Sequence, residues 1–125
     1  MTADPTTEAT LSTVNAFNEA LNRHDVDAVM ALMTDDCVFE NTWPAPDGER
    51  YQGQAAVRGF WERLIAGSPA AHFEIEELFA AGDRATQRWR YTWVDPQGGA
   101  GHIRGVDVFR VRDGKVAEKL AYVKG

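Results

Sequence analysis

Residues 102–122 read HIRGVDVFRVRDGKVAEKLAY and predict the β-hairpin around which the fold is organised. Two apolar runs, 103–111 and 116–123, flank the dipeptide Asp113-Gly114. This dipeptide suits the positive φ angles of a type I′ turn, which joins two antiparallel strands directly. The turn therefore predicts which side chains of the two strands share a face.

One charged residue lies on the apolar face of this hairpin. Alternation along the first strand puts Asp107 on the same face as Phe109, and pairing outward from the turn adds Lys119 and Ala121. Burying an unpaired carboxylate is costly, so Asp107 needs a partner, a cation or a catalytic role. We expect Asp107 as an acid/base, with Lys119 setting its ionisation or holding a ligand anion, and Asn41 donating to a carbonyl oxygen. A purely structural Asp107–Lys119 link is the alternative.

The remainder of the chain predicts three helices, one short strand and two further long strands. The apolar spacing changes from the helical period to the strand period after residue 71. A breaker-rich loop over residues 42–52 carries Trp43. We expect helices at about 6–22, within 25–34 and at 54–67, and strands at 37–41, 72–81 and 84–94. Helices segregated from a four-stranded antiparallel meander predict an α+β fold, in a single domain over residues 1–125.

Composition and charge exclude several partners. The net charge is −6 and the pI about 5.0, with arginines scattered among acids, so we expect no nucleic-acid partner and no membrane surface. No apolar run approaches the roughly 20 residues of a spanning helix. The N-terminus lacks signal-peptide features and Cys37 is the single cysteine, which predicts a cytoplasmic location. The three histidines lack metal-ligand spacing, and the glycines of 98–105 join two strands, so we expect no metal and no nicotinamide cofactor.

Three segments resemble the SnoaL-like branch of the nuclear transport factor 2-like superfamily. They are FNEALNRHDVDAVMALMTDDCVFEN (17–41), YQGQAAVRGFW (51–61) and GVDVFRVRDGKVAEKLAYVKG (105–125). The resemblance implies a curved, mostly antiparallel sheet wrapped as a cone-shaped roll around a long N-terminal helix, with two further helices. It also implies an apolar cavity at one end and a homodimer formed through the outer sheet face.

The resemblance extends to ketosteroid isomerases at individual positions. Asp107 matches the protonated aspartate with which these isomerases bind the developing enolate. The pKa of that aspartate is raised in these enzymes. Their helix tyrosine falls on Phe17, and their aspartate base falls on Asn41, which is no proton acceptor. SnoaL-type polyketide cyclases resemble the sequence around Asp107. Limonene epoxide hydrolases need a further carboxylate where this chain has Ala121.

The leading hypothesis is a cofactor-independent isomerase, cyclase or dehydratase acting on a small hydrophobic carbonyl compound. Its rival is a non-catalytic module that binds such a ligand or forms an accessory dimer, and an epoxide hydrolase comes third. Aromatic and small inward-facing residues are expected to form the substrate-binding wall. These residues are Phe17, Trp43, Phe60, Trp61, Trp89, Tyr91, Phe109 and Ala121.

Overall fold

The computed structural model describes residues 4–125 and contains three helices and six strands in that range. The helices are α1 (Pro5–Asn22), α2 (Val26–Ala31) and α3 (Gln54–Gly67). The strands are β1 (Met33–Glu40), β2 (Arg50–Gln52), β3 (His72–Ala81), β4 (Arg84–Val94), β5 (Ala100–Arg112) and β6 (Lys115–Val123).

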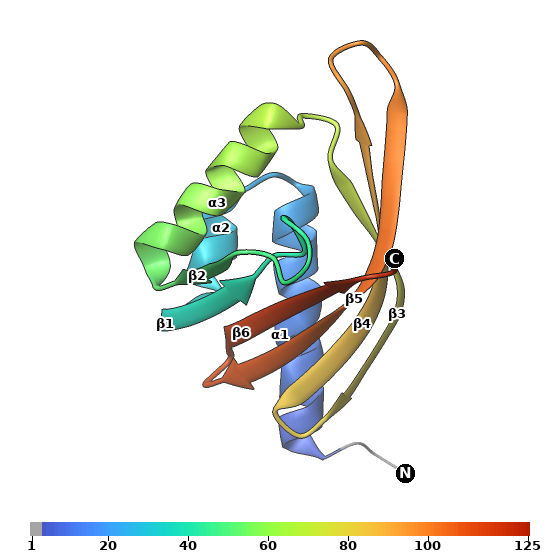
Figure 1. Cartoon of the computed structure of the whole chain (residues 1–125). Coiled ribbons are helices and arrows are strands. Elements are labelled where there is room, and N and C mark those ends of the chain that lie inside the picture. Colours follow the sequence, from blue (N-terminus) through green and yellow to red (C-terminus); the bar gives the residue numbers. More distant parts are fainter. Residues whose placement is uncertain (1–3) are drawn as a thin grey trace.

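The long helix α1 supplies the surface against which the sheet packs. The Asp4 carboxylate caps its first turn by accepting from the Thr7 amide at 3.0 Å, and Pro5 occupies the first helical position. Val14, Phe17 and Leu21 recur at helical spacing and are buried. Figure 1 shows the sheet curving around this helix, with α2 and α3 toward the β1–β2 end.

The six strands form one unclosed, curved sheet in the order β2-β1-β6-β5-β4-β3. The predicted antiparallel meander β3-β4-β5-β6 is confirmed, and β1 joins its far edge by pairing parallel to β6. The turn prediction is also confirmed, because Asp113 and Gly114 have φ angles of 53° and 73°. The α+β roll around an N-terminal helix is therefore the observed fold.

The predicted boundary between the second helix and the first strand is wrong, and the prediction lacks β2. The second helix ends at Ala31, and β1 begins at Met33 rather than at residue 37, because Met33 pairs with Val116 of β6. The strand β2 lies inside the segment that was predicted to be a loop, where it pairs antiparallel with the end of β1. Both differences come from pairing with a distant strand or an existing sheet edge, which local propensity does not report.

Bulges set which residues of two strands face inward. Arg110 pairs with Glu118 and Val111 with Val116, so Ala117 is an extra residue in β6. Regular pairing outward from the turn would set Lys119 opposite Val108, on the outer face. The offset instead places Lys119 opposite Phe109 and Ala121 opposite Asp107, on the inner face. A second irregularity lies in β3, between Ile75 and Glu77.

None of the helices in residues 4–125 is long and apolar enough to cross a membrane. The same residues contain no group of three or more histidine, cysteine, aspartate or glutamate side chains arranged to hold a metal ion.

Gly105 allows the indole of Trp89 to lie against β5. A Cβ atom at residue 105 would sit 2.5 Å from Trp89 Cζ2 and would also collide with the Tyr122 carbonyl oxygen. We expect Gly105→Ala to lower the free energy of unfolding by about 1–3 kcal/mol, the usual cost of overpacking. Urea denaturation measures this loss.

Gly59→Ala is the matched control, because the added Cβ in α3 meets only the flexible end of Arg63. Alanine is the better helix former, so this variant should gain about 0.5–1 kcal/mol. Equal stabilities for the two variants would contradict the close approach of Trp89 to β5.

Candidate functional site

An apolar cavity of about 220 Å³ lies between the inner sheet face, α3 and the start of the loop after β1. Aromatic side chains form most of its wall, and one cation, Lys119, belongs to that wall. The lining residues are Phe39, Asn41, Thr42, Trp43, Phe60, Trp61, Leu64, Phe73, Trp89, Tyr91, Ile103, Lys119 and Ala121.

Lys119 is a buried lysine on this wall. Only 4% of its surface is exposed, and its Nζ donates to Asp107 Oδ1 at 3.2 Å. The same nitrogen lies 4.9 Å from the centroid of the Phe39 ring and 5.5 Å from that of Trp61. A carboxylate and two aromatic faces all attract a positive charge, so the ammonium is held at this position.

Asp107 lies behind Lys119 and does not line the cavity. Its second oxygen, Oδ2, accepts from Gln87 Nε2 at 2.9 Å. Gln87 in turn exchanges two hydrogen bonds with Asn18 of α1, at 2.7 and 3.2 Å. All four side chains are buried. They form a continuous polar chain that runs from α1 across the inner face of β4, β5 and β6 to the cavity. The chain supplies hydrogen bonds to both oxygens of the buried carboxylate.

Sequence reasoning missed Gln87 and Asn18. A signal for Gln87 exists, since it occupies the inward position between Ala85 and Trp89 in the alternation of β4, where an apolar residue is expected. Asn18 directly follows Phe17 and is buried, although it is not one of the apolar residues that recur at helical spacing along α1. A polar residue at such a position needs a buried partner, and here the partner is the other amide.

Most of the expected wall residues do line the cavity. They are Trp43, Phe60, Trp61, Trp89, Tyr91 and Ala121, with Asn41 beside them. Trp43 is 72% exposed, so it belongs to the mouth. The Asn41 amide nitrogen lies 3.5 Å from the Trp43 carbonyl oxygen, which places this amide at the mouth as well.

Phe17 and Phe109 do not line the cavity. Both are fully buried in the core, where their rings meet edge to face at 6.0 Å between centroids. The wall uses other side chains that the sequence reasoning did not select. These are Phe39, Thr42, Leu64, Phe73 and Ile103. Inward orientation was predictable for strand residues, but depth along the curved sheet separates core from cavity wall.

The other polar candidates lie outside the cavity. Glu40, which precedes Asn41 at the end of β1, accepts a hydrogen bond from Arg50 at 2.8 Å, and the exposed His72 and His102 are absent from the wall. Burial raises the pKa of Tyr91, an effect that outweighs the opposing hydrogen bond from Ser68, so its phenol stays protonated at neutral pH. Among the lining residues of the described chain there is no aspartate, glutamate or histidine.

The sequence profile of the SnoaL-like domain matches residues 14–119. The chain belongs to the SnoaL-like family. Its solved structural neighbours include NTF2-like proteins, and structures named after SnoaL-like polyketide cyclases and ketosteroid isomerases share the fold. The chain has no match among curated protein sequences.

Three solved structures illustrate how far this SnoaL-like fold is shared. An NTF2-like protein of unknown function from Mesorhizobium loti is 43% identical, with 99% of this chain and 98% of that chain covered and a TM-score of 0.82. A protein from Mycobacterium tuberculosis in complex with estradiol-17β-hemisuccinate is 25% identical, with 91% of this chain and 92% of that chain covered and a TM-score of 0.79. TerC, co-crystallised with polyporic acid, is 16% identical, with 93% of this chain and 92% of that chain covered and a TM-score of 0.79.

The buried ion pair should behave as a coupled unit in stability measurements. Lys119→Met leaves the Asp107 carboxylate without its cation, and removing one partner of a buried pair costs about 3–5 kcal/mol. Adding Asp107→Asn removes the stranded charge, so the double variant should recover most of this loss. A double-mutant cycle by urea denaturation measures the coupling.

Lys115→Met is the control, because Lys115 is an exposed lysine at the start of the same strand. It should change stability by no more than about 0.5 kcal/mol. A Lys119→Met variant as stable as Lys115→Met would show that the Asp107 charge needs no partner.

Proposed function

We propose that this SnoaL-like protein is a cofactor-independent enzyme that binds a small hydrophobic carbonyl compound in its cavity and transfers protons at the carbonyl group. The observation that supports this function most directly is the Lys119 ammonium, held by Asp107 on the wall of an otherwise apolar and aromatic cavity. Isomerisation, cyclisation and dehydration of carbonyl compounds all pass through such proton transfers.

The wall supports a hydrophobic ligand. Aromatic and aliphatic side chains dominate it, and small-molecule sites typically combine such walls with a few polar groups that fix orientation. Two structural neighbours carry hydrophobic ligands, estradiol-17β-hemisuccinate in one and polyporic acid in the other. We infer a ligand of the same general character for this chain.

Lys119 has the central role in the proposed reaction. Its ammonium donates a proton to the ligand carbonyl oxygen, and the resulting amine then accepts a proton from the adjacent carbon, which yields the enol and restores the ammonium. Asp107 acts through Lys119, because its carboxylate lies behind the nitrogen and holds it in position with a hydrogen bond of 3.2 Å. Asn41, at the mouth, is positioned to donate to a second oxygen of the ligand.

A non-catalytic binding module is the second candidate. Both Asp107 oxygens already accept hydrogen bonds, and the lining residues of the described chain include no carboxylate or imidazole base. An epoxide hydrolase has the least support, because its relay needs two aspartates and an arginine, whereas Ala121 and Lys119 occupy this part of the wall.

Exchange of α-protons tests the proposed chemistry without knowledge of the natural substrate. We expect the wild type to accelerate deuterium incorporation into 1-indanone, acetophenone or cyclohexanone in D₂O by about 10²-fold or more, the usual contribution of a positioned acid or base. Proton NMR follows the loss of the α-proton signal. Lys119→Met should return the rate to that of buffer.

Lys115→Met keeps the charge change of this variant but lies outside the cavity, so it should retain the wild-type rate. The double variant Lys119→Met/Asp107→Asn, with its fold checked by circular dichroism, separates loss of the ammonium from loss of structure. Binding of all three ketones with no exchange would favour the binding module over the enzyme.

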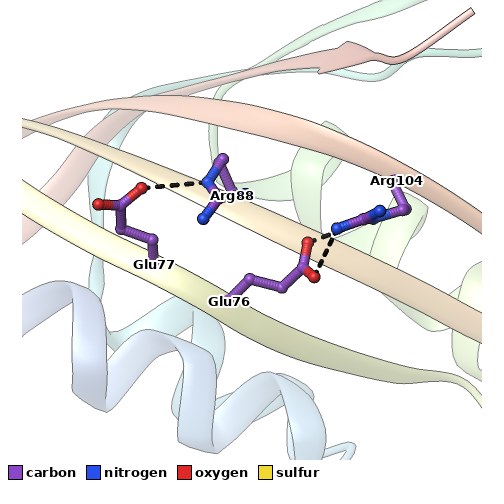
Figure 2. A network of polar contacts seen from close by, with 4 residues as sticks. All are labelled: Glu76, Glu77, Arg88 and Arg104. Atoms are coloured by element: carbon purple, nitrogen blue, oxygen red, sulfur yellow. Dashed lines mark hydrogen bonds and ion pairs between the residues drawn. The ribbon is translucent and has the colours of Figure 1, made fainter.

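We also propose that two copies of the chain pair through the outer sheet face. The β3 irregularity leaves Glu76 and Glu77 both on this face. Arg104 Nη2 lies 2.6 Å from Glu76 Oε2, and Arg88 Nε lies 3.1 Å from Glu77 Oε1 (Figure 2). Tyr122 beside them is 57% exposed. An exposed aromatic side chain beside charges that are already paired within the chain is typical of a face that binds another protein.

Sedimentation at micromolar protein should therefore give the mass of a dimer. Tyr122→Glu replaces an exposed aromatic side chain of this face with a charge, so we expect it to shift the equilibrium to the monomer, whereas Lys115→Met should not. A monomeric mass for the wild type would contradict the proposed pairing.

A further inference from the structure

The cavity wall carries polar hydrogens for which the described residues supply no acceptor. An ammonium carries three donor hydrogens, and the hydrogen bond to Asp107 uses one of those on Lys119. Nearby rings of Phe39 and Trp61 face the ammonium but accept no conventional hydrogen bond. Two donors of a buried cation therefore remain for a ligand.

Two indole N–H groups are further donors without a protein acceptor. The Nε1 atoms of Trp61 and Trp89 are buried and have no hydrogen-bond partner among the described residues, and both side chains line the cavity. An indole nitrogen only donates. A buried donor without an acceptor is unfavourable, so an acceptor supplied by a ligand would relieve two such groups at once.

The volume limits the size of the enclosed part of the ligand. A cavity of roughly 150 Å³ is enough for benzene, and this cavity measures about 220 Å³. It therefore encloses one six-membered ring with a small polar substituent. Anything larger has to extend through the mouth, past the exposed Trp43.

We infer that the cavity binds a single-ring compound whose carboxylate accepts hydrogen bonds from Lys119 and from the indoles of Trp61 and Trp89. An ionised carboxylate offers about four acceptor positions, which matches two free ammonium hydrogens and two indole hydrogens. Lys119 then lies between two carboxylates, that of Asp107 behind it and that of the ligand in front. This inference rests on the cavity named under the proposed function, but it requires no turnover.

Isothermal titration calorimetry with benzoate, benzamide and benzylamine tests the inference. The three probes share one ring and differ in charge at the substituent. Benzoate should bind wild type about tenfold or more tightly than benzamide, because hydrogen bonds to a charged acceptor are the stronger ones, and benzylamine should bind least. The double variant Lys119→Met/Asp107→Asn should lose the preference for benzoate.

Indole variants locate the donors. Trp61→Phe and Trp89→Phe keep an aromatic ring but remove the N–H, so each should weaken benzoate about threefold to tenfold with little effect on benzamide. Trp93→Phe is the matched control, because Trp93 lies on β4 with Trp89 but does not line the cavity. It should leave both affinities unchanged.

The outcomes separate this inference from the proposed function. Equal affinities for benzoate and benzamide, or a benzoate preference that survives in the double variant, would overturn the carboxylate site even if ketone exchange is observed. A benzoate preference without any ketone exchange would leave the carboxylate site standing and count against the enzyme.

Discussion

The ion pair between Lys119 and Asp107 is the interaction on which the inner face of this protein depends. Two charges removed from water are tolerable only when each is neutralised and hydrogen bonded. Gln87 donates to the second oxygen of the carboxylate and is itself hydrogen bonded to Asn18, and two aromatic rings face the ammonium. The pair thereby joins α1, β4, β5 and β6 through buried polar contacts, and it presents a single cation to an apolar cavity.

Curvature and bulges turn this pair toward the cavity. The extra residue at Ala117 shifts the register of β6, so Lys119 faces inward opposite Phe109. Another irregularity in β3 has the opposite consequence, because it leaves Glu76 and Glu77 both on the outer face with arginine partners. A one-residue shift in pairing exchanges the two faces of a strand. The bulges therefore decide which charges are buried in the core and which lie on the outer surface.

The division between core and cavity follows from where α1 and α3 meet the sheet. Phe17 and Phe109 pack against each other in the core, whereas Trp61, Trp89 and Tyr91 line the cavity between the sheet and α3. Filling the core with apolar side chains stabilises the fold. Leaving the cavity open costs stability and provides a site for a ligand.

The sequence alone determined the hairpin, the antiparallel meander and the inward face that holds Asp107, because turn chemistry and alternation are local properties. Tertiary structure decided the β1–β6 and β1–β2 pairings, the bulge at Ala117, the recruitment of Gln87 and Asn18, and the position of Asp107 behind Lys119. These features depend on contacts between residues far apart in the chain. Periodicity predicts the face of a strand on which a residue lies, but the packing of helices against a curved sheet fixes how deep it lies.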